Sequence, residues 1–95
     1  MVDPGDTVLR DLGRRVSELR RSREMTQETL AEEANVTVQY LQRIEGGREN
    51  LTVRSLVRLA KLLDVQVREL FRAPRSRRAP VGRPKAMRRP TRRAR

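Results

Sequence analysis

Polar side chains between residues 37 and 45 could read the edges of DNA bases. Leu41 and Ile44 are three residues apart, which places them on one side of a short helix. The opposite side of that helix carries Val38, Gln39, Gln42 and Arg43. A Gln amide can pair with adenine at two points, an Arg guanidinium can pair with N7 and O6 of guanine, and a Val side chain can contact a thymine methyl group. This pattern is typical of a helix that enters the major groove of DNA.

The same stretch of chain predicts a second short helix and a tight turn. Thr26 can cap the first of the two helices by accepting a hydrogen bond from a backbone N–H, and Thr37 can cap the second. The inward-facing residues of the first helix are Leu30, Ala31 and Ala34. Asn35 lies where the chain must turn sharply, and Asn is one of the few residues besides Gly that tolerate a positive φ. Residues 26–47 therefore predict a helix-turn-helix.

A helix is expected before this motif, from about residue 7 to residue 22. Its apolar residues recur at three- and four-residue intervals, at Leu9, Leu12, Val16 and Leu19. Asp6 or Thr7 would cap its N-terminus. Gly13 lowers the helix propensity inside this segment, so we expect it to pack closely against a neighbouring helix.

Two further helices are expected after the motif. The fourth helix runs from about residue 53 to residue 63, with Thr52 as its cap, and its apolar set is wider than one core face requires. A short fifth helix, at about residues 67–71, would bring Leu70 and Phe71 into the core. The fold class is therefore all-α, with five helices in one compact domain at residues 1–72.

The positive charge of the chain is concentrated at its C-terminus. The net charge is +11; residues 1–72 hold 13 Lys or Arg against 12 Asp or Glu, whereas residues 73–95 hold 10 Lys or Arg and no acid. Four prolines in this tail prevent a continuous helix, and almost nothing apolar is left to bury. We expect a disordered Arg/Pro-rich arm that attracts DNA phosphates, with a merely solubilising tail as the alternative.

A short segment of the tail resembles an AT-hook, the minor-groove binder built around an Arg-Gly-Arg-Pro core. Residues 80–85 read Pro-Val-Gly-Arg-Pro-Lys, so Val81 stands where the first Arg would be. Arg83 and Lys85 are the residues expected to contact DNA. Binding of phosphates by the ten basic residues of the tail, without entry into the minor groove, remains the alternative.

The composition argues against several classes of protein. The chain has no Cys and no His, which excludes disulfides and thiolate metal sites and removes the commonest general base. Three acids have the spacing of a solvated helix face rather than a catalytic cluster: Glu28, Glu32 and Glu33. We therefore expect no enzyme, metal or cofactor. No apolar run approaches the roughly 18 to 20 residues that cross a bilayer, and no signal-peptide pattern is present, so a cytoplasmic, nucleoid-associated protein is expected.

Residues from about 12 to 71 resemble the Cro/CI (Xre-type) family of helix-turn-helix repressors. The matching residues are Leu12-Gly13 with Arg20, Thr26-Gln27-Glu28, Leu30-Ala31, Ile44-Glu45 followed by Gly47, and Leu59-Ala60 with Leu63 and Val65. The chain departs from the family at Asn35, where Gly is usual, and at Leu51, where Pro is common. Asn accepts the same turn, and Leu adds to the core. The resemblance implies a lambda-repressor-like domain.

The resemblance also implies roles for individual residues. Gln27 would meet a DNA phosphate and reach the first turn of the recognition helix, while Val38, Gln39 and Arg43 would read bases. Arg20 and Glu45 would form a structural salt bridge between the first helix and the end of the third. The full set expected to contact DNA, caps and flanking positions included, is Thr26, Gln27, Thr37, Val38, Gln39, Tyr40, Gln42, Arg43, Arg48, Asn50, Thr52, Arg83 and Lys85.

The function implied by the resemblance is that of a sequence-specific transcriptional regulator, expected to be a repressor that binds a pseudo-palindromic operator as a homodimer. Two recognition helices, at about residues 37–45, would enter successive major grooves about 34 Å apart. Surplus apolar residues also suggest the dimer: Val57, Leu62, Val65 and Val67. Controller proteins of restriction-modification systems, phage-type repressors and antitoxins share this form, and no residue separates them. Activation would require contact with RNA polymerase, for which the three acids named above are the candidate surface.

A second hypothesis gives the dominant role to the tail. In this case the protein would be a nucleoid-type or RNA-binding protein, with the helical domain as an adaptor for a partner. Aromatic platforms for stacking single-stranded bases are scarce, because Tyr40 and Phe71 are the only aromatic residues of the chain. Removal of the tail separates the two hypotheses, since only a regulator that reads sequence through its domain would keep its sequence preference.

Overall fold

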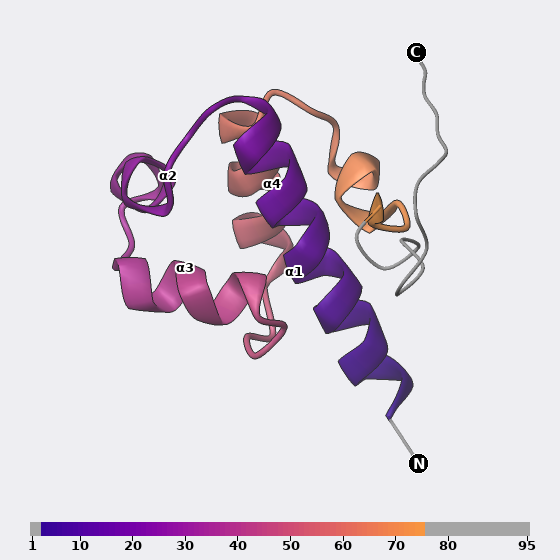
Figure 1. The fold of residues 1–95 in the computed structure, drawn as a ribbon. Coiled ribbons are helices and arrows are strands. Elements are labelled where there is room, and N and C mark those ends of the chain that lie inside the picture. The colour runs from indigo at the N-terminus through magenta and orange to yellow at the C-terminus, as the bar shows by residue number, and fades with distance from the viewer. Residues whose placement is uncertain (1–2, 76–95) are drawn as a thin grey trace, which may run out of the picture.

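The computed structural model describes residues 3–75, which form four α-helices and one 3₁₀ helix and contain no strand (Figure 1). The elements are α1 (Pro4–Ser22), α2 (Gln27–Ala34), α3 (Val38–Glu45), α4 (Val53–Leu62) and the 3₁₀ helix η1 (Val67–Phe71). The all-helical class is confirmed, and the segment expected to form a short fifth helix is a 3₁₀ helix. A 3₁₀ turn is a common form for a segment of only five residues. None of the helices in this part of the chain is long and apolar enough to cross a membrane.

Helix α1 begins earlier than the sequence analysis predicted, at Pro4 rather than at about Thr7. Asp3 is the N-cap, and its carboxylate accepts a hydrogen bond of 2.6 Å from the backbone N–H of Gly5. Pro4 suits the first helical position because the N–H that it lacks would have no partner there. Asp6 therefore lies in the first turn of α1 and is not its cap.

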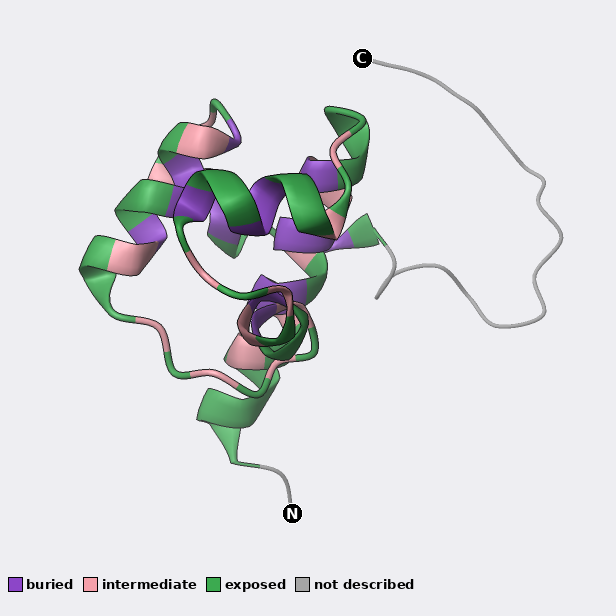
Figure 2. Ribbon diagram, turned by 90° about the vertical axis from the view of Figure 1, so that its left-hand side faces the viewer, coloured by how far each residue is buried: buried purple, intermediate pink, exposed green. Residues whose placement is uncertain are grey.

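The hydrophobic core lies where the predicted apolar faces of the helices meet. Figure 2 shows buried and exposed residues alternating around each helix, with the buried ones turned towards the interior. The core consists of Leu12, Val16, Leu30, Ala31, Leu41, Ile44, Leu56, Leu59, Ala60, Leu63 and Leu70. Every helix contributes to this list, and α3 packs chiefly against α1 and α2.

The prediction that Phe71 enters the core is wrong. Leu70 is fully buried, whereas Phe71 is 51% exposed. Adjacent side chains point about 120° apart in a 3₁₀ helix and about 100° apart in an α-helix, so in either form only one of the two can face fully inward. Pro74, which follows η1, is also fully buried, although the sequence analysis placed it in the tail.

Helix α3 rests against α1 at a contact that only Gly13 permits. A Cβ atom at Gly13 would lie 2.3 Å from the carbonyl oxygen of Ile44 and 2.7 Å from that of Glu45. Gly47, at φ +76°, makes a similar approach, since its Cβ would lie 2.7 Å from Cα of Arg10. The expected close packing at Gly13 is therefore confirmed, and its partner is the C-terminal end of α3.

Candidate nucleic-acid interface

Three threonines cap the helices around the candidate interface. Thr26, Thr37 and Thr52 are the N-caps of α2, α3 and α4, and each side chain accepts a hydrogen bond of 3.0 Å from the backbone N–H three residues later. These bonds satisfy backbone donors that the first turn of a helix leaves without a partner. The predicted caps are confirmed.

The turn between α2 and α3 depends on Asn35. This residue adopts φ 60° and ψ 44°, in the left-handed region, as the sequence predicted. Its N–H donates to the carbonyl oxygen of Glu32 at 3.1 Å, and the N–H of Val36 donates to that of Ala31 at 3.0 Å. These bonds close the end of α2 and direct the chain at once into α3.

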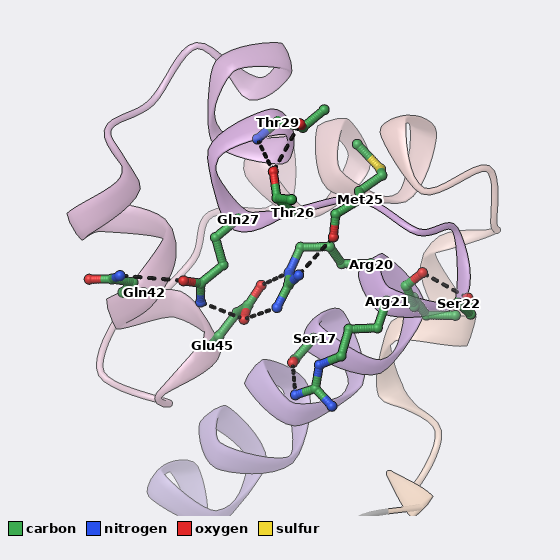
Figure 3. Close-up of polar contacts among 11 residues, drawn as sticks. Ser17, Arg20, Arg21, Ser22, Met25, Thr26, Gln27, Thr29, Gln42 and Glu45 are labelled. Carbon is green, nitrogen blue, oxygen red and sulfur yellow. Dashed lines mark hydrogen bonds and ion pairs between the residues drawn. The ribbon is translucent and has the colours of Figure 1, made fainter.

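A buried ion pair ties α1 to the end of α3, as expected (Figure 3). Arg20 Nε lies 2.7 Å from Glu45 Oε2, and Arg20 Nη2 lies 3.1 Å from Glu45 Oε1. The remaining edge of the guanidinium is occupied too, because Nη1 donates to the carbonyl oxygen of Met25 at 2.8 Å. The side chains of Arg20 and Glu45 are only 10% and 8% exposed, so this pair is part of the interior.

Gln27 connects this buried pair to the surface of α3. Its Nε2 donates to Glu45 Oε1 at 3.0 Å, and its Oε1 accepts from Gln42 Nε2 at 3.3 Å (Figure 3). The sequence analysis expected Gln27 to reach the first turn of α3, whereas it reaches the middle and the end. The tight turn keeps the start of α3 beside the end of α2, so the start of α2 faces the later part of α3.

The outer surface of α3 is formed by Gln39, Gln42 and Arg43, which are all exposed. Val38 was expected on this surface as well, but it is half-buried and packs against the core. Its place follows from the helical period, since Val38 precedes Leu41 by three residues and shares its side. Tyr40 is likewise half-buried against the core.

Arg43 has partners on two sides that the sequence analysis missed. Its Nε lies 2.7 Å from Glu49 Oε2, and its Cζ lies 5.5 Å from the centre of the Tyr40 ring. Glu49 belongs to the loop after α3, where the backbone turns at Gly47. A pairing that crosses such a turn depends on loop geometry, for which the residue spacing gives no signal.

The other expected contact residues lie on segments next to α3 in the sequence or at the starts of helices. Arg48, Asn50 and Thr52 are exposed in the loop that joins α3 to α4 and at the start of α4, and Thr26 and Thr37 are exposed at the starts of the two motif helices. The acids Glu28, Glu32 and Glu33 are exposed on α2. Arg83 and Lys85 lie outside the described residues. Most of the described part of the predicted set is thus open to solvent, on α2, on α3 and in the loop that follows α3.

Comparison with known proteins agrees with this arrangement. The helix-turn-helix family model HTH_3 matches residues 16–70. The restriction-modification controller protein C.AhdI from Aeromonas hydrophila is 36% identical, with a TM-score of 0.63, over 66% of this chain and 96% of its own. The biofilm master regulator SinR, solved in complex with DNA, is 32% identical, with a TM-score of 0.58, over 62% of this chain and 95% of its own. A comparison with curated proteins gives no significant match.

An enzyme also shares the fold. Hydroxypropylphosphonic acid epoxidase from S. wedmorenis is 22% identical, with a TM-score of 0.68, over 70% of this chain but only 36% of its own. At this identity the likeness concerns the fold alone. The similarity therefore covers a helical part of that enzyme and carries no argument for the same chemistry in this chain.

Proposed function

The chain belongs to the Xre-type (Cro/CI) helix-turn-helix family, and its similarity to known regulators indicates a DNA-binding regulator. We propose that it recognises a specific operator and represses transcription. The observation that carries this proposal is the exposed polar row of Gln39, Gln42 and Arg43 on a helix that is fixed from behind. Gly13 and the Arg20–Glu45 pair supply the fixation. A rigidly held row of such side chains suits direct readout of bases.

In the proposed complex, α3 lies in the major groove. Gln39 pairs with adenine, and Arg43 pairs with N7 and O6 of guanine. Gln27, at the first position of α2, meets a phosphate where the helix N-terminus favours negative charge. Arg48 and Asn50 contact the sugar-phosphate backbone beside the groove. The basic tail adds attraction to phosphates that does not depend on sequence.

The proposed regulator binds as a homodimer, with one copy of α3 in each half-site. Of the apolar residues that suggested a dimer, Leu62, Val65 and Val67 are already partly buried against the core of their own protomer. Val57 is 48% exposed, but it shares its surface with Arg54, Arg58 and Lys61. A symmetric contact there would bring like charges together. We propose that the dimer surface is formed by the three partly buried residues together with the half-exposed Phe71, next to which Arg72 is paired with Glu69.

The experiment that tests this function is selection of bound sites from a pool of genomic DNA. Full-length protein would be compared with a short form that consists of residues 1–75. The short form ends after Pro74 because this residue is buried in the folded domain. We expect both forms to enrich the same palindrome. The short form lacks nine basic residues, so its affinity should fall less steeply with added salt.

The alternative, an arm-driven binder, gives the opposite result in the same experiment. In that case residues 1–75 would enrich no site, and full-length protein would bind the selected and scrambled duplexes equally well. Circular dichroism of the short form is the control, since a loss of helix would make its failure to bind uninformative. A folded short form without sequence preference would refute the proposed function.

A further inference from the structure

We propose that Glu49 is a positioning residue that makes Arg43 selective for guanine. The inference rests on the proposed function, because it concerns how one side chain of α3 reads a base pair. Its starting point is the pair described above, in which Arg43 Nε and Glu49 Oε2 are 2.7 Å apart. Glu49 is a loop residue outside the set of side chains expected to touch DNA, and its role is exerted through Arg43.

The contact with Glu49 restricts the orientation of the Arg43 guanidinium. A guanidinium is planar, and its five N–H groups have fixed directions within that plane. Glu49 engages the Nε edge, while the ring of Tyr40 lies 5.5 Å from Cζ. The two Nη groups form the remaining edge. That edge supplies the two donors that N7 and O6 of guanine accept together.

The burial of the two partners indicates which of them moves less. The Glu49 side chain is 23% exposed, whereas that of Arg43 is 49% exposed. The carboxylate is thus the more enclosed group and acts as the fixed support, while the guanidinium extends from it towards solvent. An ion pair this open to water contributes little to stability, so its effect should appear in binding rather than in folding.

Glu49 also makes non-specific binding by Arg43 less favourable. An Arg without a partner can turn to any nearby phosphate, and such a contact carries no sequence information. Arg43 must give up its charge-assisted bond to Glu49 before it can turn in this way, and the carboxylate, left without its partner, would then repel the phosphates. Contact with guanine requires no such exchange, because Nε stays on the carboxylate. The pair therefore favours the specific contact over the non-specific one.

The experiment uses the full chain and the operator that it selects. Affinities of wild type, Glu49→Ala, Glu49→Gln, Arg43→Ala and the double variant would be measured on that operator and on duplexes with each base pair substituted in turn. We expect Glu49→Ala to reduce discrimination for guanine about tenfold, at the same base pair that Arg43→Ala affects. The double variant should match Arg43→Ala alone. Glu33→Ala, which removes an exposed acid on α2, is the matched control and should leave discrimination unchanged.

Glu49→Gln separates positioning from simple charge. The Gln amide oxygen can still accept from Arg43 Nε, so this variant should retain more discrimination than Glu49→Ala. Equal behaviour of the two variants, with a uniform rise in affinity for all duplexes, would overturn the inference in favour of a charge effect. If the wild type prefers no site, the proposed function fails and this inference fails with it. If the wild type prefers a site and Glu49→Ala keeps full discrimination there, only the role of Glu49 is refuted.

Discussion

Two arginine–glutamate pairs involve residues of α3, and their shortest contacts are equally long. In both pairs Arg Nε lies 2.7 Å from Glu Oε2. The inner pair, Arg20–Glu45, is about nine-tenths buried and has a further hydrogen bond to the backbone at Met25. The outer pair, Arg43–Glu49, is half open to water on the Arg side.

This difference shows that the surroundings, rather than the bond itself, decide what such a pair does. In the inner pair, loss of one partner leaves a charge in the interior, which is costly. In the outer pair, water can replace a lost partner, so little stability depends on it. The inner pair is therefore suited to fixing α3 in place, and the outer pair to controlling what α3 presents to a ligand.

The largest expected effect is that of Glu45→Ala. The variant leaves the Arg20 guanidinium buried without its carboxylate, which should cost about 3–5 kcal/mol of unfolding free energy. Urea unfolding followed by circular dichroism measures this loss. Glu49→Ala is the control from the outer pair, and the comparison above fails if the two variants lose equal stability.

Gly13→Ala should be the next most destabilising change, because it disturbs the contact between α1 and the end of α3 that carries Glu45. The added Cβ would lie 2.3 Å from the carbonyl oxygen of Ile44. The overpacking should cost about 1–3 kcal/mol, measured in the same unfolding experiment. At Gly46 a Cβ would come no closer than 3.3 Å to its nearest neighbour, so Gly46→Ala is the matched control. Similar losses for both variants would argue against a special contact at Gly13.

Gln27→Ala tests the connection between the inner pair and the outer surface of α3. The variant removes the hydrogen bonds to Glu45 and Gln42, so stability should fall by about 0.5–1.5 kcal/mol. Affinity for the operator should fall as well. Gln39→Ala, on the exposed face of α3, should weaken binding with no measurable loss of stability. If Gln27→Ala leaves the unfolding free energy unchanged, the hydrogen-bonded chain has no structural role.

The smallest expected effect is that of Glu49→Ala on stability. The loss of unfolding free energy should be below about 1 kcal/mol. It should disappear in 1 M salt, where the screening length for exposed charges is only about 3 Å. The deficit of Glu45→Ala should persist at the same salt concentration, because its site is buried. Unfolding curves of both variants at low and high salt provide the measurement. If the loss of stability in Glu49→Ala does not depend on salt, the outer pair stabilises the fold as a buried pair does, and the proposed difference between the two pairs is wrong.

Features governed by local chemistry were predicted well from the sequence. The caps at Thr26, Thr37 and Thr52 and the left-handed Asn35 follow from what those side chains do to nearby backbone groups. The start of α1 was missed because the prediction followed the apolar period, which begins only at Leu9. The helix in fact begins at Pro4, where Asp3 acts as the cap.

Features that depend on tertiary geometry were predicted less well. Phe71 was misplaced because adjacent residues of any helix point in different directions, and Leu70 is the one that faces the core. Val38 was assigned to the outer face, although its position three residues before Leu41 turns it partly towards the core. The contact between Arg43 and Glu49 could not be predicted, since it crosses the turn at Gly47. The expected DNA contacts remain predictions that the measurements above address.

The contact at Gly13 has a consequence for how this domain could change over evolutionary time. Gly13 faces the carbonyl oxygens of Ile44 and Glu45, so this part of the contact between α1 and α3 is formed by backbone atoms. Exchange of the outward side chains at positions 39, 42 and 43 leaves those atoms in place. A lineage could therefore acquire a new target sequence through a few surface substitutions, without first having to evolve a new way of holding the helix.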